Sequence, residues 1–279
     1  MKIQKTIVQI LNEAPLQIEH IETGLTNDNY HVKTKHYDVV LRMPKPENQG
    51  LFDYHHEASV LNLLKTTELE PHLWYFDPKT GIKCADYVHG AQTFSIEYLE
   101  RAAKLMASLH KRHLKSAKIF SIKAHFELYC SRIQNPYYHL DFVENLMNQA
   151  DHYTHDDPIL CHNDLVPGNF LFTDTHDYLI DYEYAMDNDP CSDVMSFITE
   201  NDIIDHETRN RFYIAYFGSL PDAALQHKLD VFEVAHNALW CAWGQMMFES
   251  HQQPIYQEIA DLKYQRLCEA YQKTAHANV

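Results

Sequence analysis

The sequence predicts an α+β protein of two lobes. It has an N-terminal antiparallel five-stranded sheet with one main helix, and a larger, mostly helical C-terminal lobe. Strand-like apolar runs fill residues 18–88, and apolar positions at helical spacing fill most of the chain after residue 95. The length of 279 residues suits one large domain or two lobes. We therefore expect an N-terminal lobe over residues 1–90, with a hinge near 85–90, and a C-terminal lobe over residues 91–279.

Alternation and turn residues predict the elements of the N-terminal lobe. Residues 1–11 alternate charged and apolar side chains, as an amphipathic helix does. The other expected elements are strands over 18–23, 30–34 and 37–43, a helix over 53–65, and strands over 71–77 and 82–88. The first two strands form a hairpin around the turn 24–29, and the last two turn at residues 78–81, which begin with Pro and end with Gly.

The C-terminal lobe is predicted to be helical with a short β-rich insertion. Helices are expected over 95–111, 122–134 and 138–150, and from residue 193 onward with breaks near 218–221 and at Pro254. Between them, short apolar runs at 158–161, 170–173 and 178–180 predict three strands.

A polar loop lies between the first two strands of this insertion. It contains the pattern H-x-D-x-x-x-x-N, formed by His162, Asp164 and Asn169, and Asp181 follows the third strand directly. Phosphoryl transfer needs one carboxylate that orients the attacking hydroxyl and two oxygen ligands that hold Mg²⁺ against the phosphates. Asp164 fits the first role, and Asn169 and Asp181 fit the second. An isolated H-x-D is usually a turn or a helix cap, but a second carboxylate after a hairpin favours the catalytic interpretation.

The N-terminal lobe offers matching contacts for a nucleotide. Arg42 ends an apolar strand, where a kinase places the basic residue that contacts the α- and β-phosphates. Glu57, on the first turns of the next helix, is its natural ion-pair partner, although alone it would indicate only a favourable charge at a helix N-terminus. The turn 24–29 holds a single glycine, so it is a weak phosphate-binding signal. The hinge 85–90 would offer backbone groups to an adenine ring.

The composition disfavours several classes of partner and site. Lys and Arg number 23 against 39 Asp and Glu, which gives a formal net charge of -16 with the 20 histidines neutral. Nucleic acids and anionic membranes are bound through basic surfaces, so this charge disfavours both and modestly favours a cationic substrate. No apolar run approaches membrane-spanning length and no signal peptide is recognisable, so we expect a cytoplasmic protein. The 6 cysteines include no C-x-x-C pair and the histidines lack a zinc-site pattern, so we expect neither disulfides nor a zinc centre.

Together these residues resemble the choline/ethanolamine kinase family of the bacterial choline kinase type. That family belongs to the aminoglycoside-phosphotransferase group, which shares the protein-kinase fold. The resemblance is carried by residues 24–30, the loop 160–169, the run 180–193, and Trp240-Cys241-Ala242-Trp243 with residues 263–266. It implies a two-lobed protein-kinase-like fold, ATP and Mg²⁺ as cofactors, and phosphorylation of the hydroxyl of choline.

The resemblance also implies a role for each matching residue. Asp164 is the catalytic carboxylate, and Asn169 and Asp181 are the magnesium ligands. The nucleotide contacts are Thr26, Asn27, Asn29, Arg42, Glu57, Asp86 and Val88, and the residues that support the catalytic loop are His162, His110 and Asp193. Arg42 stands where most kinases have Lys, but Arg keeps the positive charge and offers a broader fork of donors.

A pocket for a quaternary ammonium group is expected among the aromatic residues. Such a cation cannot donate an N–H hydrogen bond, so it is bound by aromatic faces and carboxylates. The candidates are Tyr184, Trp240, Trp243, Tyr256 and Tyr264, with Glu183 adding negative charge. Trp240 and Trp243 share one helix face at i and i+3, which without the other motifs would indicate a core stripe.

Three alternatives are weighed against choline phosphorylation. Ethanolamine, thiamine, another small cationic metabolite or an aminoglycoside are possible acceptors within the same class. A non-catalytic pseudokinase that binds a ligand belongs to another class, but every residue needed for the chemistry is present. A protein kinase is disfavoured because no D-F-G to A-P-E segment follows the catalytic loop. The sequence makes no prediction of oligomeric state.

Overall fold

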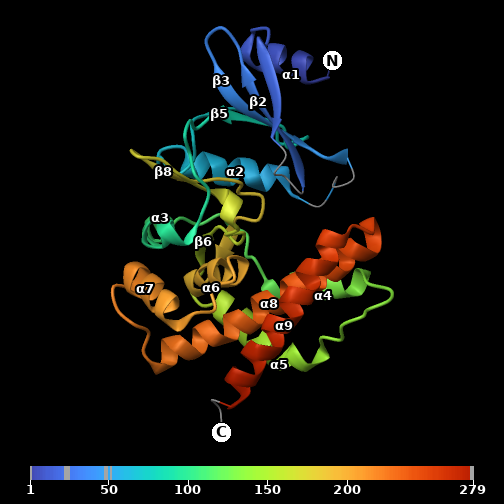
Figure 1. Cartoon of the computed structure of the whole chain (residues 1–279), viewed down its shortest axis with the longest axis vertical. Coiled ribbons are helices and arrows are strands. Elements are labelled where there is room, and N and C mark those ends of the chain that lie inside the picture. Colours follow the sequence, from blue (N-terminus) through green and yellow to red (C-terminus); the bar gives the residue numbers. More distant parts are fainter. Residues whose placement is uncertain (1, 22–25, 47–49, 51, 277–279) are drawn as a thin grey trace. The chain divides into compact units, whose positions relative to one another are not determined.

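The computed structural model describes residues 2–21, 26–46, 50 and 52–276 (Figure 1). The chain forms two compact units. Unit 1 comprises Met1–Leu109 and Pro167–Ala185, and unit 2 comprises His110–Val166 and Met186–Val279. The segment that carries Asn169 and Asp181 thus groups with the N-terminal sheet, whereas Asp164 belongs to unit 2. That residues 1–90 bind the nucleotide and residues 91–279 hold the acceptor remains a prediction.

Unit 1 is built on the predicted five-stranded antiparallel sheet, whose strand order is β1-β2-β3-β5-β4. Its strands are β1 (Gln17–Ile21), β2 (Asn27–Lys33), β3 (Asp38–Pro44), β4 (Leu73–Phe76) and β5 (Lys83–Asp86). Helix α1 (Lys2–Leu11) buries Ile7 and Leu11 against Val32, Val39 and Leu41 of the sheet. The apolar alternation of the strands therefore supplies one face of a shared core with the amphipathic first helix.

Helix α2 (Tyr54–Leu64) begins at Asp53, whose side chain accepts a hydrogen bond from the His56 N–H at 3.1 Å. This is the usual N-cap arrangement, which satisfies one of the free N–H groups of the first turn. The helix buries Val60, Leu61 and Leu64, and it also buries Glu57. Glu57 is paired with Arg42.

The remaining part of unit 1 contains a helix and a short hairpin. A 3-10 turn, η2 (Ile96–Tyr98), leads into α3 (Leu99–His110). The hairpin consists of the turn η4 (Pro167–Asn169) and strands β7 (Phe170–Phe172) and β8 (Asp177–Leu179), and it contacts the hinge side of the chain through a bridge between Gln92 and Phe172.

Unit 2 is mainly helical, as predicted. Its helices are α4 (Ile122–Arg132), η3 (Asp141–Val143), α5 (Glu144–Thr154), α6 (Pro190–Glu200), α7 (His206–Phe217), α8 (Ala223–His251) and α9 (Pro254–His276). The long helix α8 is buried over most of its length, and α9 packs along it (Figure 1). The two helices approach closely at Gly244, where a Cβ atom would lie 2.9 Å from the Tyr256 carbonyl oxygen. Strand β6 (Ile159–Cys161) pairs antiparallel with β9 (Met186–Asn188).

Two details of the predicted elements were wrong. Strand β2 begins at Asn27, so Asn27 and Asn29 are strand residues and not turn residues. They extend the ladder because β3 reaches Pro44 and pairs with both, through Asn27–Pro44 and Asn29–Arg42. Strand β9 was not predicted, because its Met-Asp-Asn sequence carries no apolar alternation. Residues 22–25, which include Gly24 and Leu25 of the predicted turn, lie outside the described residues.

Among the described residues, none of the helices combines the length and the apolar character that crossing a bilayer requires.

Candidate active site

Arg42 is the centre of a buried ionic cluster in unit 1. Its NH2 group lies 2.8 Å from Glu57 Oε2, and its NH1 group lies 2.9 Å from Asp181 Oδ1 and 3.2 Å from Glu183 Oε1. The NH2 group also donates to the Gly81 carbonyl at 3.2 Å. Burial opposes the positive charge, but Glu57, Glu183 and Asp181 outweigh it and raise the pKa of Arg42 above its ordinary value. Arg42 is therefore charged at any pH at which the protein is folded.

Glu183 lies inside this cluster. It accepts a hydrogen bond from Asn27 Nδ2 at 2.8 Å, and only 7% of its surface is exposed. Burial, and next the nearby charge of Asp181, raise the pKa of Glu183 to about 8, although Arg42 and Asn27 act in the opposite direction. Three carboxyl groups thus surround one guanidinium, so the cluster contains more acidic than basic groups.

The hairpin of unit 1 brings Asn169 and Asp181 to the same end. Asn169 directly precedes β7 and Asp181 lies two residues beyond β8, and the Ile180 N–H donates to the Asn169 carbonyl at 2.9 Å. Asp181 has a φ of 69°, in the left-handed region that a non-glycine residue seldom adopts. Such backbone strain is often found at functional sites, where the surrounding contacts hold the residue in place.

The donor set of this region fits Mg²⁺. Mg²⁺ prefers carboxylate and amide oxygens, which Asp181 and Asn169 supply. Within the described residues, the buried Oδ1 of Asn27 and Oε1 of Glu57 have no hydrogen-bond partner. Buried polar atoms are normally paired, so unused oxygens beside an acidic cluster favour a site that receives a cation or a hydrated ligand.

The predicted catalytic loop in unit 2 is held by Asp193, the fourth residue of α6. Its Oδ1 accepts the Asn163 N–H at 2.7 Å, and its Oδ2 accepts the His162 N–H at 2.7 Å and pairs with His110 Nε2 at 2.9 Å. Burial opposes the negative charge, but the hydrogen bond from His110 and the charges and N–H groups nearby lower the pKa of Asp193. Asp164 follows this braced segment directly and is partly buried.

Asn188 is a supporting residue that the sequence analysis did not identify. Its Nδ2 donates to Asn163 Oδ1 at 2.8 Å and to Ser192 Oγ at 2.9 Å, and its Oδ1 accepts from Thr154 Oγ1 at 2.9 Å. The Ser192 hydroxyl in turn lies 2.9 Å from His236 Nε2. The signal in the sequence was the Asn-Asp-Pro run before α6, a typical helix start with Pro at the first position.

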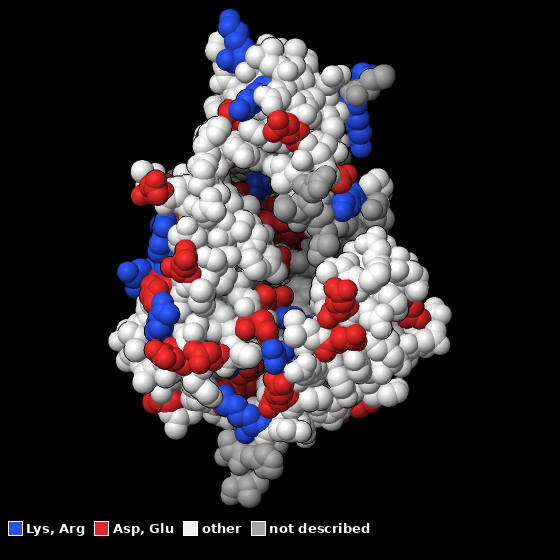
Figure 2. All heavy atoms as spheres, in the orientation of Figure 1, with Lys and Arg blue, Asp and Glu red and all other residues white. Residues whose placement is uncertain are grey.

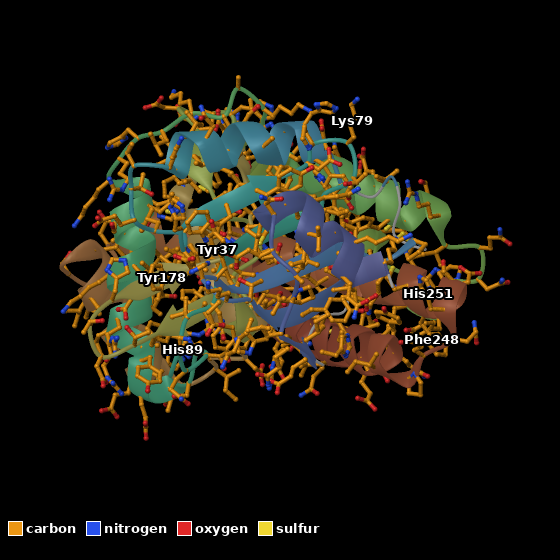
Figure 3. All side chains as sticks on the ribbon, turned by 90° about the horizontal axis from the view of Figure 1, so that it is seen from above. Tyr37, Lys79, His89, Tyr178, Phe248 and His251 are labelled. Carbon is orange, nitrogen blue, oxygen red and sulfur yellow. The ribbon has the colours of Figure 1, made fainter. Side chains whose placement is uncertain are left out.

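The predicted aromatic residues of unit 2 form two separate groups of rings. Trp240 and Trp243 lie edge to face with centroids 5.9 Å apart, and Trp243 meets Tyr256 of α9 at 5.5 Å. Tyr264 instead stacks on Tyr138 at 3.9 Å. Phe248 and His251, near the C-terminal end of α8, are labelled in Figure 3.

Tyr184 belongs to unit 1, where its ring meets Phe52 edge to face at 5.2 Å. Tyr184 and Glu183 therefore belong to a different compact unit from the other predicted pocket residues, Trp240, Trp243, Tyr256 and Tyr264.

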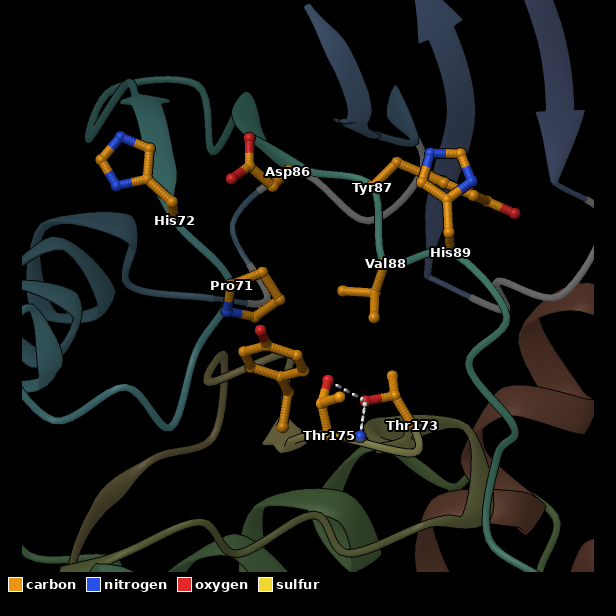
Figure 4. A pocket seen from close by; sticks show the side chains of 9 residues that line it. Pro71, His72, Asp86, Tyr87, Val88, His89, Thr173 and Thr175 are labelled. Atoms are coloured by element: carbon orange, nitrogen blue, oxygen red, sulfur yellow. Dashed lines mark hydrogen bonds between the residues drawn. The ribbon is translucent and has the colours of Figure 1, made fainter.

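The hinge residues of unit 1 line a pocket of about 290 Å³. Its lining residues are Pro71, His72, Asp86, Tyr87, Val88, His89, Thr173, Thr175 and Tyr178. Val88 points into it, toward the β7–β8 turn that carries Thr173 (Figure 4). The Asp86 N–H donates to the His72 carbonyl at 2.9 Å, and its carboxylate accepts from Trp74 Nε1 at 2.6 Å.

Thr26, directly before β2, and Asn29, on β2, lie beside the ionic cluster. Asn27 Nδ2 also donates to Thr26 Oγ1 at 3.2 Å, and Asn29 is the register partner of Arg42. Acidic side chains are spread over the face shown in Figure 2, in keeping with the formal net charge of -16.

Comparisons with known proteins agree with this geometry. Residues 17–225 match the model of the phosphotransferase enzyme family. The protein LicA of Haemophilus influenzae is 26% identical over 245 residues, which cover 81% of this chain and 72% of LicA. Among solved structures, the choline kinase LicA from Streptococcus pneumoniae superposes with a TM-score of 0.80 at 23% identity, covering 99% of this chain and 98% of that one. LicA in complex with AMP gives a TM-score of 0.77 at 23% identity, covering 99% of this chain and 97% of that one.

Proposed function

We propose that this chain, which belongs to the phosphotransferase enzyme family, transfers the γ-phosphoryl group of ATP to the hydroxyl of choline and so produces phosphocholine. The observation that carries the proposal is the buried cluster in which Arg42 contacts both Glu57 and Asp181, next to Asn169. A basic residue paired with a helix glutamate and set beside two metal-binding oxygens is what phosphoryl transfer requires. The choline-kinase fold supports the same class of reaction.

Each group in the proposed site has one task. Asp164 orients the acceptor hydroxyl and takes its proton late, because a loose transition state asks little of a base. Arg42, oriented by Glu57, contacts the phosphates, and the hinge offers the Asp86 carbonyl and the Val88 N–H to the adenine. Asn169 and Asp181 would hold Mg²⁺, which supplies charge neutralisation on the phosphate oxygens. A cytoplasmic location is part of the proposal, because ATP is the expected donor.

The choice of choline rests on the aromatic group formed by Trp240, Trp243 and Tyr256. An edge-to-face pair leaves at least one π face of each ring unused by the pair, and a methylated ammonium binds such faces without needing a hydrogen-bond acceptor. Ethanolamine is the second candidate within the class, since it shares the hydroxyl and the charge but brings N–H donors that carboxylates would satisfy.

The first experiment measures ADP release by the purified protein with MgATP and choline, ethanolamine, thiamine or no acceptor. We expect choline to give the highest kcat/KM. Asp164→Ala should lower turnover by roughly three orders of magnitude or more, because it removes the carboxylate that positions the hydroxyl. Asp156→Ala, which removes an exposed acid of the same unit, is the matched control and should keep full turnover. Bound ATP without turnover on any acceptor would support a non-catalytic protein instead.

A second variant tests the acceptor pocket. Trp243→Ala should raise the KM for choline roughly tenfold, because cation–π contacts at a desolvated site contribute about 1–2 kcal/mol, while the KM for ATP stays unchanged. Trp243→Phe keeps a ring and should recover part of the loss. If the KM for choline is the same in all three proteins, Trp243 is a core residue and the pocket lies elsewhere.

A further inference from the structure

Glu183 occupies a tight turn that the core holds in place. The turn is closed by a hydrogen bond from the Ala185 N–H to the Tyr182 carbonyl at 3.2 Å, and the Tyr182 side chain is fully buried. Because its neighbours are fixed by the core and by this bond, the Glu183 side chain has little freedom to leave the direction in which the turn points it.

One oxygen of Glu183 joins two strands of the sheet. Its Oε1 accepts from Asn27 Nδ2 at 2.8 Å and lies 3.2 Å from Arg42 NH1. Asn29 is directly opposite Arg42, and Asn27 is two residues before Asn29, so Asn27 and Arg42 project from the same face of the sheet. Glu183 therefore connects the first residue of β2 to the basic residue of β3.

The charge of Arg42 is balanced without Glu183. Glu57 already pairs with its NH2 group at 2.8 Å, and Asp181 pairs with its NH1 group at 2.9 Å. A third carboxyl group is not needed to balance the guanidinium, and burying its charged form is costly. What Glu183 supplies beyond the other two is the hydrogen bond to Asn27, which is itself 3% exposed.

The same contacts argue against a place for Glu183 in a cation pocket. A carboxylate that attracts a substrate ammonium must meet the ligand with an oxygen that is accessible. Glu183 is 7% exposed, and its Oε1 is shared between an amide donor and a guanidinium, so that of its two oxygens Oε2 is the one a ligand could meet. A substrate cation would have to compete with Arg42 for this charge.

We propose that Glu183 is a positioning residue of the nucleotide site, which aligns Asn27 and Arg42 for the phosphates, and that it does not contact the acceptor. This inference deepens the proposed function and rests on it for the identity of the donor. Asn27 acts together with Glu183, because the Asn27–Glu183 hydrogen bond is the link between the two strands.

The proposal predicts that substituting Glu183 changes the KM for ATP but not the KM for choline. Glu183→Ala should raise the KM for ATP roughly tenfold or more and lower kcat, because Asn27 loses its hydrogen-bond acceptor and Arg42 loses one of its three carboxyl contacts. The KM for choline should stay within about twofold of the wild-type value. Glu183→Gln keeps the Oε1 acceptor for Asn27 and should recover part of the nucleotide affinity.

A double-mutant cycle with Asn27→Ala tests the link itself. If Asn27 and Glu183 act through one bond, the effects of Asn27→Ala and Glu183→Ala on ATP affinity should be clearly less than multiplicative when combined. Independent, multiplicative effects would overturn the link. Glu97→Ala, an exposed acid of the same unit, is the control and should change neither constant.

The decisive measurement is the affinity for MgATP by titration calorimetry, made in parallel with turnover. Weaker ATP binding by Glu183→Ala, with partial recovery in Glu183→Gln, supports the proposal even if the wild-type protein phosphorylates none of the acceptors, an outcome that would count against the proposed function alone. Unchanged ATP affinity together with a raised KM for choline would overturn the proposal and return Glu183 to the cation pocket. If Glu183→Ala fails to fold, the comparison of Glu183→Gln with the wild type gives the same decision.

Discussion

Two buried polar networks, the Arg42 cluster of unit 1 and a network of unit 2, use their polar atoms differently. The second, called the Asp193 bracket, consists of His110, His162, Asn163, Asn188, Ser192, Asp193 and His236. In the bracket, both oxygens of Asp193 are occupied, and Asn188 uses both its amide nitrogen and its amide oxygen. In the cluster, three carboxylates share one guanidinium, and the described residues offer no partner to Glu57 Oε1 or Asn27 Oδ1.

This difference indicates different tasks. A network whose carboxylate and amide atoms are paired fixes a single geometry, because any displacement leaves one of these buried groups without a partner. A network with surplus carboxyl groups and unused oxygens is incomplete without something positive or hydrated. We infer that the bracket holds the catalytic loop rigid and that the cluster is prepared to receive a ligand. The predictions below test each half of this contrast, beginning with the largest expected effect.

Arg42→Met removes the positive centre of the cluster. Glu57 and Glu183 would then be buried without a counter-charge, and breaking a buried ion pair in this way costs about 3–5 kcal/mol. We expect the free energy of unfolding, measured with urea at pH 7, to fall by that amount. Arg132→Met, at an exposed position, is the control and should change it by less than about 0.5 kcal/mol. An unchanged midpoint for Arg42→Met would show that the carboxylates are already satisfied in another way.

His236 makes the bracket sensitive to acid. It is fully buried, and burial lowers its pKa to about 4, whereas in the unfolded chain the value is about 6.5. As the pH falls below about 6.5 the unfolded chain takes up a proton that the folded protein does not, so the free energy of unfolding decreases until about pH 4. The loss is about 3 kcal/mol, at 1.36 kcal/mol for each pKa unit.

The comparison variant is His236→Gln, which cannot take up this proton. Its free energy of unfolding should depend less steeply on pH between about 6.5 and 4 than that of the wild type, when urea unfolding is measured at several pH values. His139→Gln, at an exposed position, should keep the wild-type slope. Equal slopes for wild type and His236→Gln would contradict the prediction.

Asp193→Asn tests whether the bracket matters for catalysis. The Asn side chain keeps one acceptor oxygen but replaces the other oxygen with an NH2 donor. At least one of the hydrogen bonds from the N–H groups of His162 and Asn163 is therefore lost, and the free energy of unfolding should fall by about 1–2 kcal/mol. We expect kcat to fall roughly tenfold with both KM values unchanged, because the loop that carries Asp164 is displaced while the binding groups remain. A rise in the KM for ATP with normal kcat would show that Asp193 supports nucleotide binding instead of turnover.

The fold was predictable from the sequence because its patterns are local. Alternation in residues 18–88 predicted the antiparallel sheet, and the helical spacing after residue 95 predicted the helical part, both of which are confirmed. What could not be predicted was where Asn27 belongs, since a polar Asn-Asp-Asn run resembles a turn until β3 supplies its pairing partners. Strand β9 likewise exists only because β6 pairs with it.

By itself, the sequence determined the chemical groups of the site, because the spacing from His162 to Asn169 and the position of Asp181 after a strand are properties of a short segment. Only the tertiary structure decided which charges meet. Arg42 precedes Glu183 by more than a hundred residues, yet their side chains are in contact. Glu183 also contacts Asn27, and Arg42 also contacts Glu57. Coulomb and hydrogen-bond interactions act over a few ångströms of space, so the folded chain, and not the order of residues, places Glu183 with Arg42.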